Sequence, residues 1–347
     1  MEQSQFQTLV ALGPVLGLTL AASTAQAQTT LDLEVLSSGD ATVFVQAGDT
    51  VDYAVQAELG GAASQGLAMF AFDLVYDGGA LTQADAPTAG PLLQFVAPLG
   101  LNNPAGYGGT VRGGDLIQVG GAMNTINNQF APQPSGSVIT GIADGAPVEL
   151  ATGSFVAPTS PGTYTLRAQN LFANALESQA PAGHWVVAAV ESGSVEPLTV
   201  VVLDCGATTY CSSKVASVGC VPAISSSGSA SLGGSAVLTL VADDVVNRQI
   251  GVFVVGTEAA SDPVFGATLC VGGSVSRLIE PALSGGSGPA GSNCDGSFTR
   301  VIDSTFLVNS GFGLGDQVYC QWVFRDPAHA DGTGAGLTNA AAFVVCP

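Results

Sequence analysis

Hydrophobic and polar residues alternate along much of this chain, which is the pattern of β-strands with one buried face. In residues 51–59 the odd positions are apolar and most of the even positions are polar. Residues 70–76, 163–168 and 317–325 repeat this period of two. No stretch after residue 27 keeps the spacing and caps of an amphipathic helix. The pattern therefore predicts antiparallel strands through most of the chain.

Short runs that contain glycine, proline or aspartate separate the predicted strands. They lie at residues 47–49, 77–79, 160–162 and 313–315, and these residue types form tight turns. Many short strands joined by such turns are typical of two packed sheets. We therefore predict an all-β protein with two antiparallel β-sandwich domains of the jelly-roll or immunoglobulin-like type.

Cysteine content and charge both change near residue 204, which indicates a domain boundary. All seven cysteines follow it. Residues 1–203 carry 16 acidic and 2 basic residues, whereas residues 205–347 carry 10 acidic and 5 basic residues. We predict a signal peptide at residues 1–27, a first β-sandwich domain at residues 28–204 and a cysteine-containing β-sandwich domain at residues 205–347.

The first residues have the features of an export signal. An apolar run at residues 9–22 precedes Ala25 and Ala27, which fit the small-x-small rule for signal peptidase. The first Lys or Arg is Arg112, so either the leader is weak or the assigned start lies downstream of the true one. A buried N-terminal helix is the alternative. We predict cleavage after Ala27 and release of a secreted, extracellular bacterial protein with no membrane insertion.

The charge balance excludes whole classes of partner. The chain has 7 Lys and Arg against 27 Asp and Glu, a formal net charge of −20. So few cations cannot neutralise a run of phosphates, which excludes nucleic-acid binding. Anionic membrane surfaces are poor partners for the same reason. With 47% hydrophobic residues, the chain can still bury a substantial core.

Three segments of the first half resemble the cohesin-like β-sandwiches, which are related to several carbohydrate-binding modules. They are residues 47–51 (AGDTV), residues 66–77 (GLAMFAFDLVYD) and the pair at residues 150–155 and 162–166 (LATGSF and GTYTL). The resemblance covers most of residues 30–203 and implies a cohesin-like fold for the first domain. A cohesin binds a dockerin through one sheet face, but these motifs are core and turn residues and do not identify such a contact set.

The second half resembles an uncharacterised β-rich module found at the C-terminal end of secreted bacterial proteins. The segments that carry the resemblance are residues 210–211 (YC), 228–231 (GSAS), 269–273 (LCVGG) and 321–327 (QWVFRDP). The resemblance implies an exported β-domain and carries no known activity.

The cysteine pattern predicts disulfides rather than a metal site. The seven residues are Cys205, Cys211, Cys220, Cys270, Cys294, Cys320 and Cys346. In an exported domain they indicate three bridges with one cysteine left over, and the pairing stays open. Cys320 shares the inward face with Trp322, so it is a candidate for a core bridge or for the odd buried thiol. The spacing lacks the Cys-x2-Cys pairs of zinc sites.

Two segments of the second half contain candidate oxygen ligands for calcium. Residues 243–244 and 291–296 are rich in oxygen ligands, but the latter segment lacks the first and last carboxylates of an EF-type loop. We therefore predict no cofactor, with a structural calcium ion as the alternative.

The chain offers little recognisable catalytic chemistry. Its two histidines are His184, which we interpret as an edge or turn residue, and His329, which lies among carboxylates in a predicted loop. The motifs of serine hydrolases, zinc proteases, P-loops and dinucleotide sites are absent. Glycosidases need only a carboxylate pair. The candidate carboxylates, which also suit turn caps and solvated faces, are Asp73, Asp77, Asp115 and Glu149.

A sugar-binding face needs exposed aromatic rings, and Tyr107 and Trp185 are the best candidates. The alternative for Tyr107 is a residue that plugs a loop, and the alternative for Trp185 is a residue that caps the core. Asn102 and Asn124 could add polar contacts from a long segment rich in glycine and amides. We predict a secreted, non-catalytic binding or adhesion protein that recognises extracellular polysaccharide or a protein partner. An extracellular glycan hydrolase and a structural surface or matrix component are the alternatives.

Overall fold

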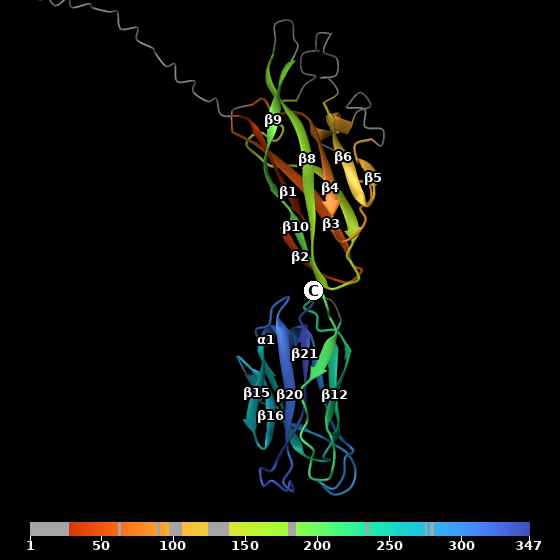
Figure 1. Ribbon diagram of the computed structural model, residues 1–347, viewed down its shortest axis with the longest axis vertical. Helices are drawn as coiled ribbons and strands as arrows, with labels where there is room; N and C mark the ends of the chain where they lie inside the picture. Colours follow the sequence, from red (N-terminus) through yellow and green to blue (C-terminus); the bar gives the residue numbers. More distant parts are fainter. Residues whose placement is uncertain are drawn as a thin grey trace, which may run out of the picture.

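The computed structural model describes residues 28–61, 64–88, 91–96, 106–123, 139–179, 185–233, 236–274, 276–277 and 281–347. They form two β-rich lobes arranged end to end, the first from residues 30–203 and the second from residues 207–344 (Figure 1). The predicted all-β, antiparallel sandwich fold is confirmed. The predicted signal peptide lies outside the described residues. In the described part of the chain, no helix is long and apolar enough to cross a membrane.

The described residues of the first lobe form ten strands and a short 3-10 helix. They are β1 (Thr30–Leu36), β2 (Thr42–Gln46), β3 (Thr50–Gly60), β4 (Leu67–Tyr76), η1 (Pro91–Val96), β5 (Thr110–Arg112), β6 (Asp115–Ala122), β7 (Val148–Val156), β8 (Gly162–Gln179), β9 (Trp185–Glu196) and β10 (Leu198–Leu203).

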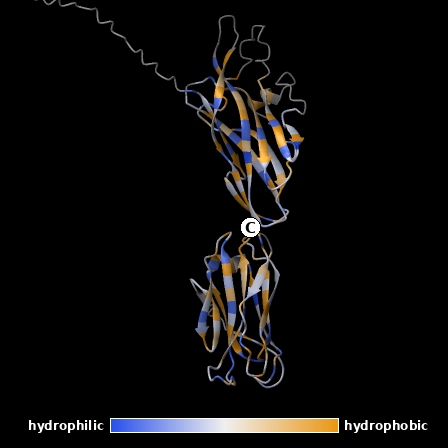
Figure 2. Ribbon diagram, in the orientation of Figure 1, coloured by the Kyte–Doolittle hydropathy of each residue, from blue (hydrophilic) through white to orange (hydrophobic). Residues whose placement is uncertain are grey.

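These strands form two layers. One layer has the order β5-β6-β4-β8-β10-β2, and the other has the order β9-β1-β3-β7. Strand β9 joins them, because it pairs antiparallel with β8 and parallel with β1. Alternation turns Val51, Tyr53 and Val55 of β3 inward, where they are buried with Phe70 and Phe72 of β4. Figure 2 shows the alternation of hydrophobic and hydrophilic residues along the strands.

The second lobe has its own core and more, shorter sheets. Its elements are β11 (Ala207–Tyr210), β12 (Ala223–Gly228), β13 (Leu238–Val245), β14 (Ile250–Gly256), β15 (Glu258–Val264), β16 (Ala267–Gly272), β17 (Ser276–Arg277), β18 (Ala282–Leu283), β19 (Gly296–Ile302), α1 (Ser304–Asn309), β20 (Gln317–Arg325) and β21 (Ala335–Val344). One sheet has the order β11-β21-β20-β14-β17, and a second has the order β12-β13-β19. In the core between them Trp322 stacks on Phe298, with ring centroids 4.6 Å apart.

The cysteines form three disulfides in the second lobe. The pairs are Cys205–Cys346, Cys211–Cys270 and Cys220–Cys294. All seven cysteines are described, and the prediction of three bridges with one odd thiol is confirmed. The odd thiol is Cys320, whose pKa is raised to about 12 by burial.

The Cys205–Cys346 bridge links the two ends of the second lobe. The first strand of this lobe, β11, pairs antiparallel with its last strand, β21, so the lobe begins and ends on the same side. The end of the chain accordingly lies where the two lobes meet (Figure 1).

Candidate functional site

The outer face of the layer β9-β1-β3-β7 is polar because of the strand alternation. On β3, Asp52, Ala54, Gln56 and Glu58 point outward, while the residues between them are buried. Strands β1 and β7 flank β3, in register over most of its length, so their outward side chains extend this surface on both sides.

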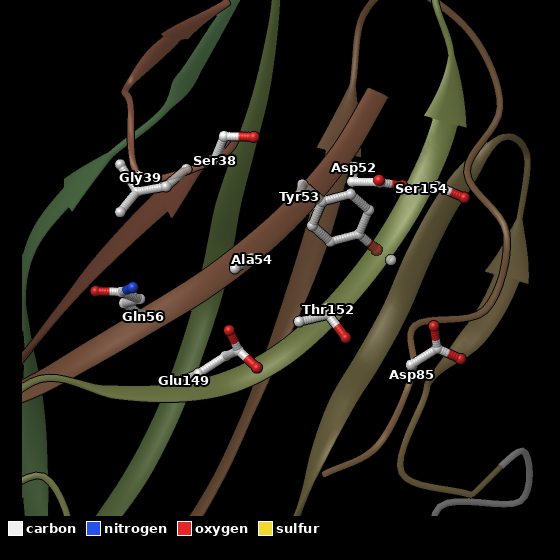
Figure 3. A pocket seen from close by; sticks show the side chains of 12 residues that line it. Ser38, Gly39, Asp52, Tyr53, Ala54, Gln56, Asp85, Glu149, Thr152 and Ser154 are labelled. Atoms are coloured by element: carbon white, nitrogen blue, oxygen red, sulfur yellow. The ribbon is translucent and has the colours of Figure 1, made fainter. Parts of the chain in front are cut away.

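The larger of two hollows on this face measures about 480 Å³ and lies over β3 and β7, beside the turn at residues 38–39 (Figure 3). Three separate segments supply its carboxylates: Asp52 comes from β3, Glu149 from β7, and Asp85 from the segment that follows β4. Figure 3 shows Glu149 and Asp85 on either side of Thr152. The hollow therefore has acidic groups on more than one side.

A second hollow of about 190 Å³ adjoins the first, and Gln56 lines both. Its carboxylates are Asp32, Glu34, Glu58 and Glu196. Asp32 also joins β1 to β9, because it accepts hydrogen bonds from the backbone N–H and the hydroxyl of Ser194 at 2.6 and 3.1 Å. We call the surface that carries these seven carboxylates of the two hollows the acidic face.

The cations of the first lobe lie elsewhere. Among its described residues the basic side chains are Arg112 on β5 and Arg167 on β8, and both strands belong to the other layer. No described Lys, Arg or His lines either hollow. The acidic face therefore carries negative charge that no described cation of this lobe lies beside to offset.

Tyr53 of β3 is among the residues that line the larger hollow, but its side chain lies on the buried side of the strand. It is 3% exposed, and its hydroxyl has no hydrogen-bond partner, as is also the case for Tyr76 in the same core. Tyr53 pairs across the ladder with Gly153 of β7, and a Cβ at Gly153 would lie 2.5 Å from the phenol oxygen. Burial and then the negative charge of Asp85 raise the pKa of Tyr53 to about 12. Figure 3 shows the phenol pointing toward β7, with Asp85 beyond that strand.

The segment that carries Asp85 is fastened to the edge of β7. The Asp85 backbone N–H donates to the Thr152 carbonyl at 2.7 Å, and the Thr82 hydroxyl donates to the Ser154 carbonyl at 3.4 Å. These bonds hold the Asp85 backbone beside the hollow, although residues 85 and 152 are far apart in sequence.

The structure corrects the interpretation of Tyr107 as an exposed ring. Tyr107 is 8% exposed, its hydroxyl donates to the Leu150 carbonyl at 2.5 Å, and its ring packs edge-on against Phe70. Burial raises its pKa. It is a core residue in this structure, and its ring is not available to stack on a sugar.

The other predicted ligand residues do not form a described site. Trp185 begins β9, opposite Gln179, and its side chain is outside the described part. Asn102, Asn124 and His184 also lie outside the described residues. Their predicted roles stay predictions.

His329 belongs to a network that holds a loop of the second lobe. Its ring nitrogens contact the Val215 carbonyl at 2.9 Å and the Asp331 carboxylate at 2.8 Å. The buried Lys214 ammonium pairs with the same carboxylate at 2.6 Å and donates to the Phe265 and Ala335 carbonyls. These contacts join segments far apart in sequence, so the cluster is structural.

Three of the four candidate glycosidase carboxylates have turn or strand roles. Asp73 accepts from the Gln118 backbone N–H and the Asn170 amide at 2.9 and 2.8 Å. Asp77 accepts from the backbone N–H and hydroxyl of Thr165. Asp115 lies opposite Arg112 in the β5–β6 ladder, beside the turn that joins these strands. Glu149 is the one of the four that lines the larger hollow.

The oxygen-rich segment at residues 291–296 is held by hydrogen bonds to the turn between β13 and β14 and to Ser287. The Asn247 amide oxygen accepts from the backbone N–H groups of Ser292 and Asn293, and Asp295 accepts from Ser287. Nowhere in the described ranges are three or more His, Cys, Asp or Glu side chains placed to hold a metal ion.

Sequence reasoning missed Asp52, Asp85 and Tyr53. The outward position of Asp52 follows from the alternation in residues 51–59, so a signal for it was present. The sequence could not predict that Asp52 and Asp85 line the same hollow. Their proximity to it depends on the pairing of β3 with β7 and on the hydrogen bonds that hold the segment of Asp85 to β7.

No family model and no curated protein matches the chain. Similar solved structures include the seventh ScaB type I cohesin from Pseudobacteroides cellulosolvens, which is 14% identical, with 50% of this chain and 94% of that chain covered and a TM-score of 0.32. The sixth cohesin of Acetivibrio cellulolyticus scaffoldin B, solved with a Cel5 dockerin, is 14% identical, with 50% and 99% covered and a TM-score of 0.30. The Yersinia pseudotuberculosis adhesin InvE is 12% identical, with 90% and 57% covered and a TM-score of 0.21. The cohesin likeness indicated by the sequence motifs thus recurs among solved structures. This likeness concerns the fold.

Proposed function

We propose that this chain is an extracellular, non-catalytic binding protein that holds a protein partner on the acidic face of its first lobe. The observation that carries the proposal is the pair of adjoining hollows over β1, β3 and β7, lined by carboxylates, hydroxyls and the Gln56 amide. Polar and charged side chains on an open sheet face can form hydrogen bonds and ion pairs with the surface of another protein. The three disulfides support a location outside the reducing interior of the cell.

A protein partner is favoured over a polysaccharide by the placement of aromatic rings. Stacking on sugars needs aromatic rings that are exposed together on one surface. Among the described residues the well-exposed aromatic rings are Phe172 on β8, which is 52% exposed, and Phe265 in the second lobe, which is 53% exposed. They lie in different lobes and neither lines the hollows, so they offer no shared platform.

A binding panel tests the proposal. The mature chain is immobilised and exposed to a basic, a neutral and an acidic protein, and to insoluble cellulose and chitin. We expect the immobilised chain to retain protein rather than polysaccharide. The double variant Glu34→Gln, Glu58→Gln should retain less protein than the unchanged chain. The matched control is Asp262→Asn, which neutralises an exposed carboxylate of β15 in the second lobe. Retention of none of these probes, or retention that ignores the Glu34 and Glu58 changes, contradicts the proposal. Retention on polysaccharide that Trp185→Ala abolishes moves the site to β9.

One observation favours a second candidate, an extracellular glycan hydrolase. Asp52, Asp85 and Glu149 share one hollow, and glycosidases act through two carboxylates that flank the scissile bond. Release of reducing sugar from soluble glycans, lost in Glu149→Gln, would establish this candidate and would displace the binding proposal.

A further inference from the structure

We infer that the Cys205–Cys346 disulfide restricts motion between the two lobes, so that the chain behaves in solution as one stiff two-lobed body. The bridge fixes the connecting segment to the second lobe at the place where the lobes meet (Figure 1). It leaves Asp204 as the residue between the paired strand of the first lobe and that fixed point. The inference concerns the junction and does not depend on the proposed function.

The first lobe holds the connecting segment as far as Leu203. Strand β10 pairs parallel with β2 and antiparallel with β8. Its pairing with β2 continues to Leu203, which lies opposite Gln46, and the preceding residue, Val202, is buried. Backbone that is paired and buried opens far less readily than an exposed loop. Freedom between the lobes therefore begins only after Leu203.

The second lobe holds the same segment again at Cys205. Its disulfide partner Cys346 is fully buried. The Cys346 backbone N–H donates to the Ala230 carbonyl at 2.7 Å, and its carbonyl accepts from the Leu232 N–H at 2.9 Å. Cys346 is therefore a fixed part of the second lobe, and the disulfide extends this fixed part to Cys205.

The disulfide shortens the free connection between the lobes. Without it, the first residue paired in the second lobe would be Ala207, which lies opposite Phe343, and residues 204–206 would be free. With it, the connection has the soft backbone dihedrals of one residue instead of three. The Asp204 carboxylate also accepts a hydrogen bond from the Gly206 N–H at 3.1 Å, which is an Asx turn that orders this residue further.

A non-covalent contact lies beside the covalent link. A Cβ at Gly315 would lie 3.3 Å from a ring carbon of Phe44, so a turn of the second lobe meets β2 of the first. Phe44 lies opposite Val201 of β10, the strand that leads into the connection. Gly315 donates its N–H to the Val345 carbonyl at 2.8 Å, next to the bridged cysteine. The contact and the bridge therefore join the same parts of the two lobes.

The bridge, rather than this contact, should decide how stiffly the lobes are joined. Lobes of one chain are expected to move relative to each other unless their interface is large and hydrophobic. One aromatic ring against a glycine turn is a small contact. A covalent bond that shortens the connection to Asp204 limits the available orientations whatever the area of the interface. It would also fix the direction in which the first lobe presents the acidic face.

Relaxation of the backbone amide nitrogens in the full mature chain measures how each lobe tumbles. A stiff two-lobed body gives both lobes one common rotational diffusion, whereas lobes joined flexibly tumble separately and faster. We expect the unchanged chain to show common tumbling, and the double variant Cys205→Ser, Cys346→Ser to lose it. The matched control is Cys220→Ser with Cys294→Ser. It removes a disulfide of the second lobe that does not involve the connecting segment, and it should keep the common tumbling.

Two insertions test the junction with every disulfide intact. A run of about four glycines is flexible, and placed between Leu203 and Asp204 it lengthens the connection ahead of the bridge. This insertion should abolish the common tumbling. The same run between Cys205 and Gly206 should leave the tumbling unchanged, because Cys346 still holds Cys205. The contrast between the two insertions decides the question even if the serine variant unfolds the second lobe.

The other outcomes contradict the inference. Separate tumbling of the lobes in the unchanged chain overturns it. Common tumbling that survives the insertion ahead of the bridge, or that survives in a folded Cys205→Ser, Cys346→Ser variant, shows that the Phe44 contact holds the lobes and overturns it as well. Equal loss of common tumbling in both insertions assigns the restraint to the length of the connection and not to the disulfide. Amide spectra of each variant show whether both lobes are folded.

Discussion

Replacing Tyr53 by phenylalanine removes one buried oxygen and leaves the ring in its place beneath Gly153. The same change at Tyr107 is a matched control, because that hydroxyl is also buried but donates to the Leu150 carbonyl at 2.5 Å. The two substitutions delete the same atom from the same core. They differ in whether the deleted hydroxyl has a partner.

The difference in hydrogen bonding sets the expected sign of each effect. A buried polar group without a partner destabilises the folded state by about 1–3 kcal/mol. We therefore expect Tyr53→Phe to raise the free energy of unfolding of the first lobe by about 1 kcal/mol. Tyr107→Phe breaks a hydrogen bond and leaves the Leu150 carbonyl buried without its partner, so it should lower that free energy by about 1–2 kcal/mol.

Differential scanning calorimetry of the full chain measures both effects. For a lobe of this size, a change of about 1 kcal/mol shifts the melting temperature by roughly 2–4 °C. The two variants should therefore shift the transition of the first lobe in opposite directions and leave that of the second lobe unchanged. If Tyr53→Phe lowers the melting temperature as Tyr107→Phe does, the Tyr53 hydroxyl has a partner in solution. The argument that this hydroxyl is buried without a partner is then wrong.

Three further predictions concern titration and covalent links. Because the pKa of Tyr53 is raised to about 12, the folded state holds this proton more tightly than the unfolded chain does, and the free energy of unfolding should fall as the pH rises from about 10 through 12. A denaturation midpoint that is flat over this range, or one whose alkaline fall is the same in Tyr53→Phe, contradicts this. Replacing Cys205 and Cys346 by serine opens a link between residues 141 apart and should lower the unfolding free energy of the second lobe by about 5 kcal/mol in urea titrations; a loss below about 1 kcal/mol would contradict the loop-entropy account. The hydrogen bond from Lys214 lowers the pKa of Asp331, so this pair should stabilise the second lobe above about pH 4 and lose its effect as the pH falls. Lys214→Met should reduce that acid dependence, which melting temperatures between pH 2 and 6 would reveal.

Alternation in the sequence predicted the strands and their buried faces because a strand turns successive side chains to opposite sides. Val51, Tyr53 and Val55 are buried as this rule requires. The same rule failed to identify Tyr107 as a core residue, because Tyr107 lies in a turn outside any strand, where no period applies. Its burial depends on its contacts with Phe70 and Leu150, which are distant in sequence.

The candidate site was only partly readable for a related reason. The alternation in residues 51–59 places Glu58 outward, but its position on one surface with Asp32 and Glu34 depends on the pairing of β1 with β3 and β9. The same holds for the cysteines. Their number predicted three disulfides and one odd thiol, but which cysteines pair with one another could be determined only from the structure. Composition and period describe each strand, and only the pairing order decides which side chains become neighbours.

The acidic face works against the stability of the free protein. Seven carboxylates line its two hollows without a described cation among them, and like charges on one surface repel one another. A partner that brings positive charge to this surface would relieve the repulsion, whereas a neutral or acidic partner would not. Departures from locally favourable design tend to gather at functional sites. The uncompensated charge is therefore the reason to look for the partner on this face rather than on the opposite layer, where both described arginines of the first lobe lie.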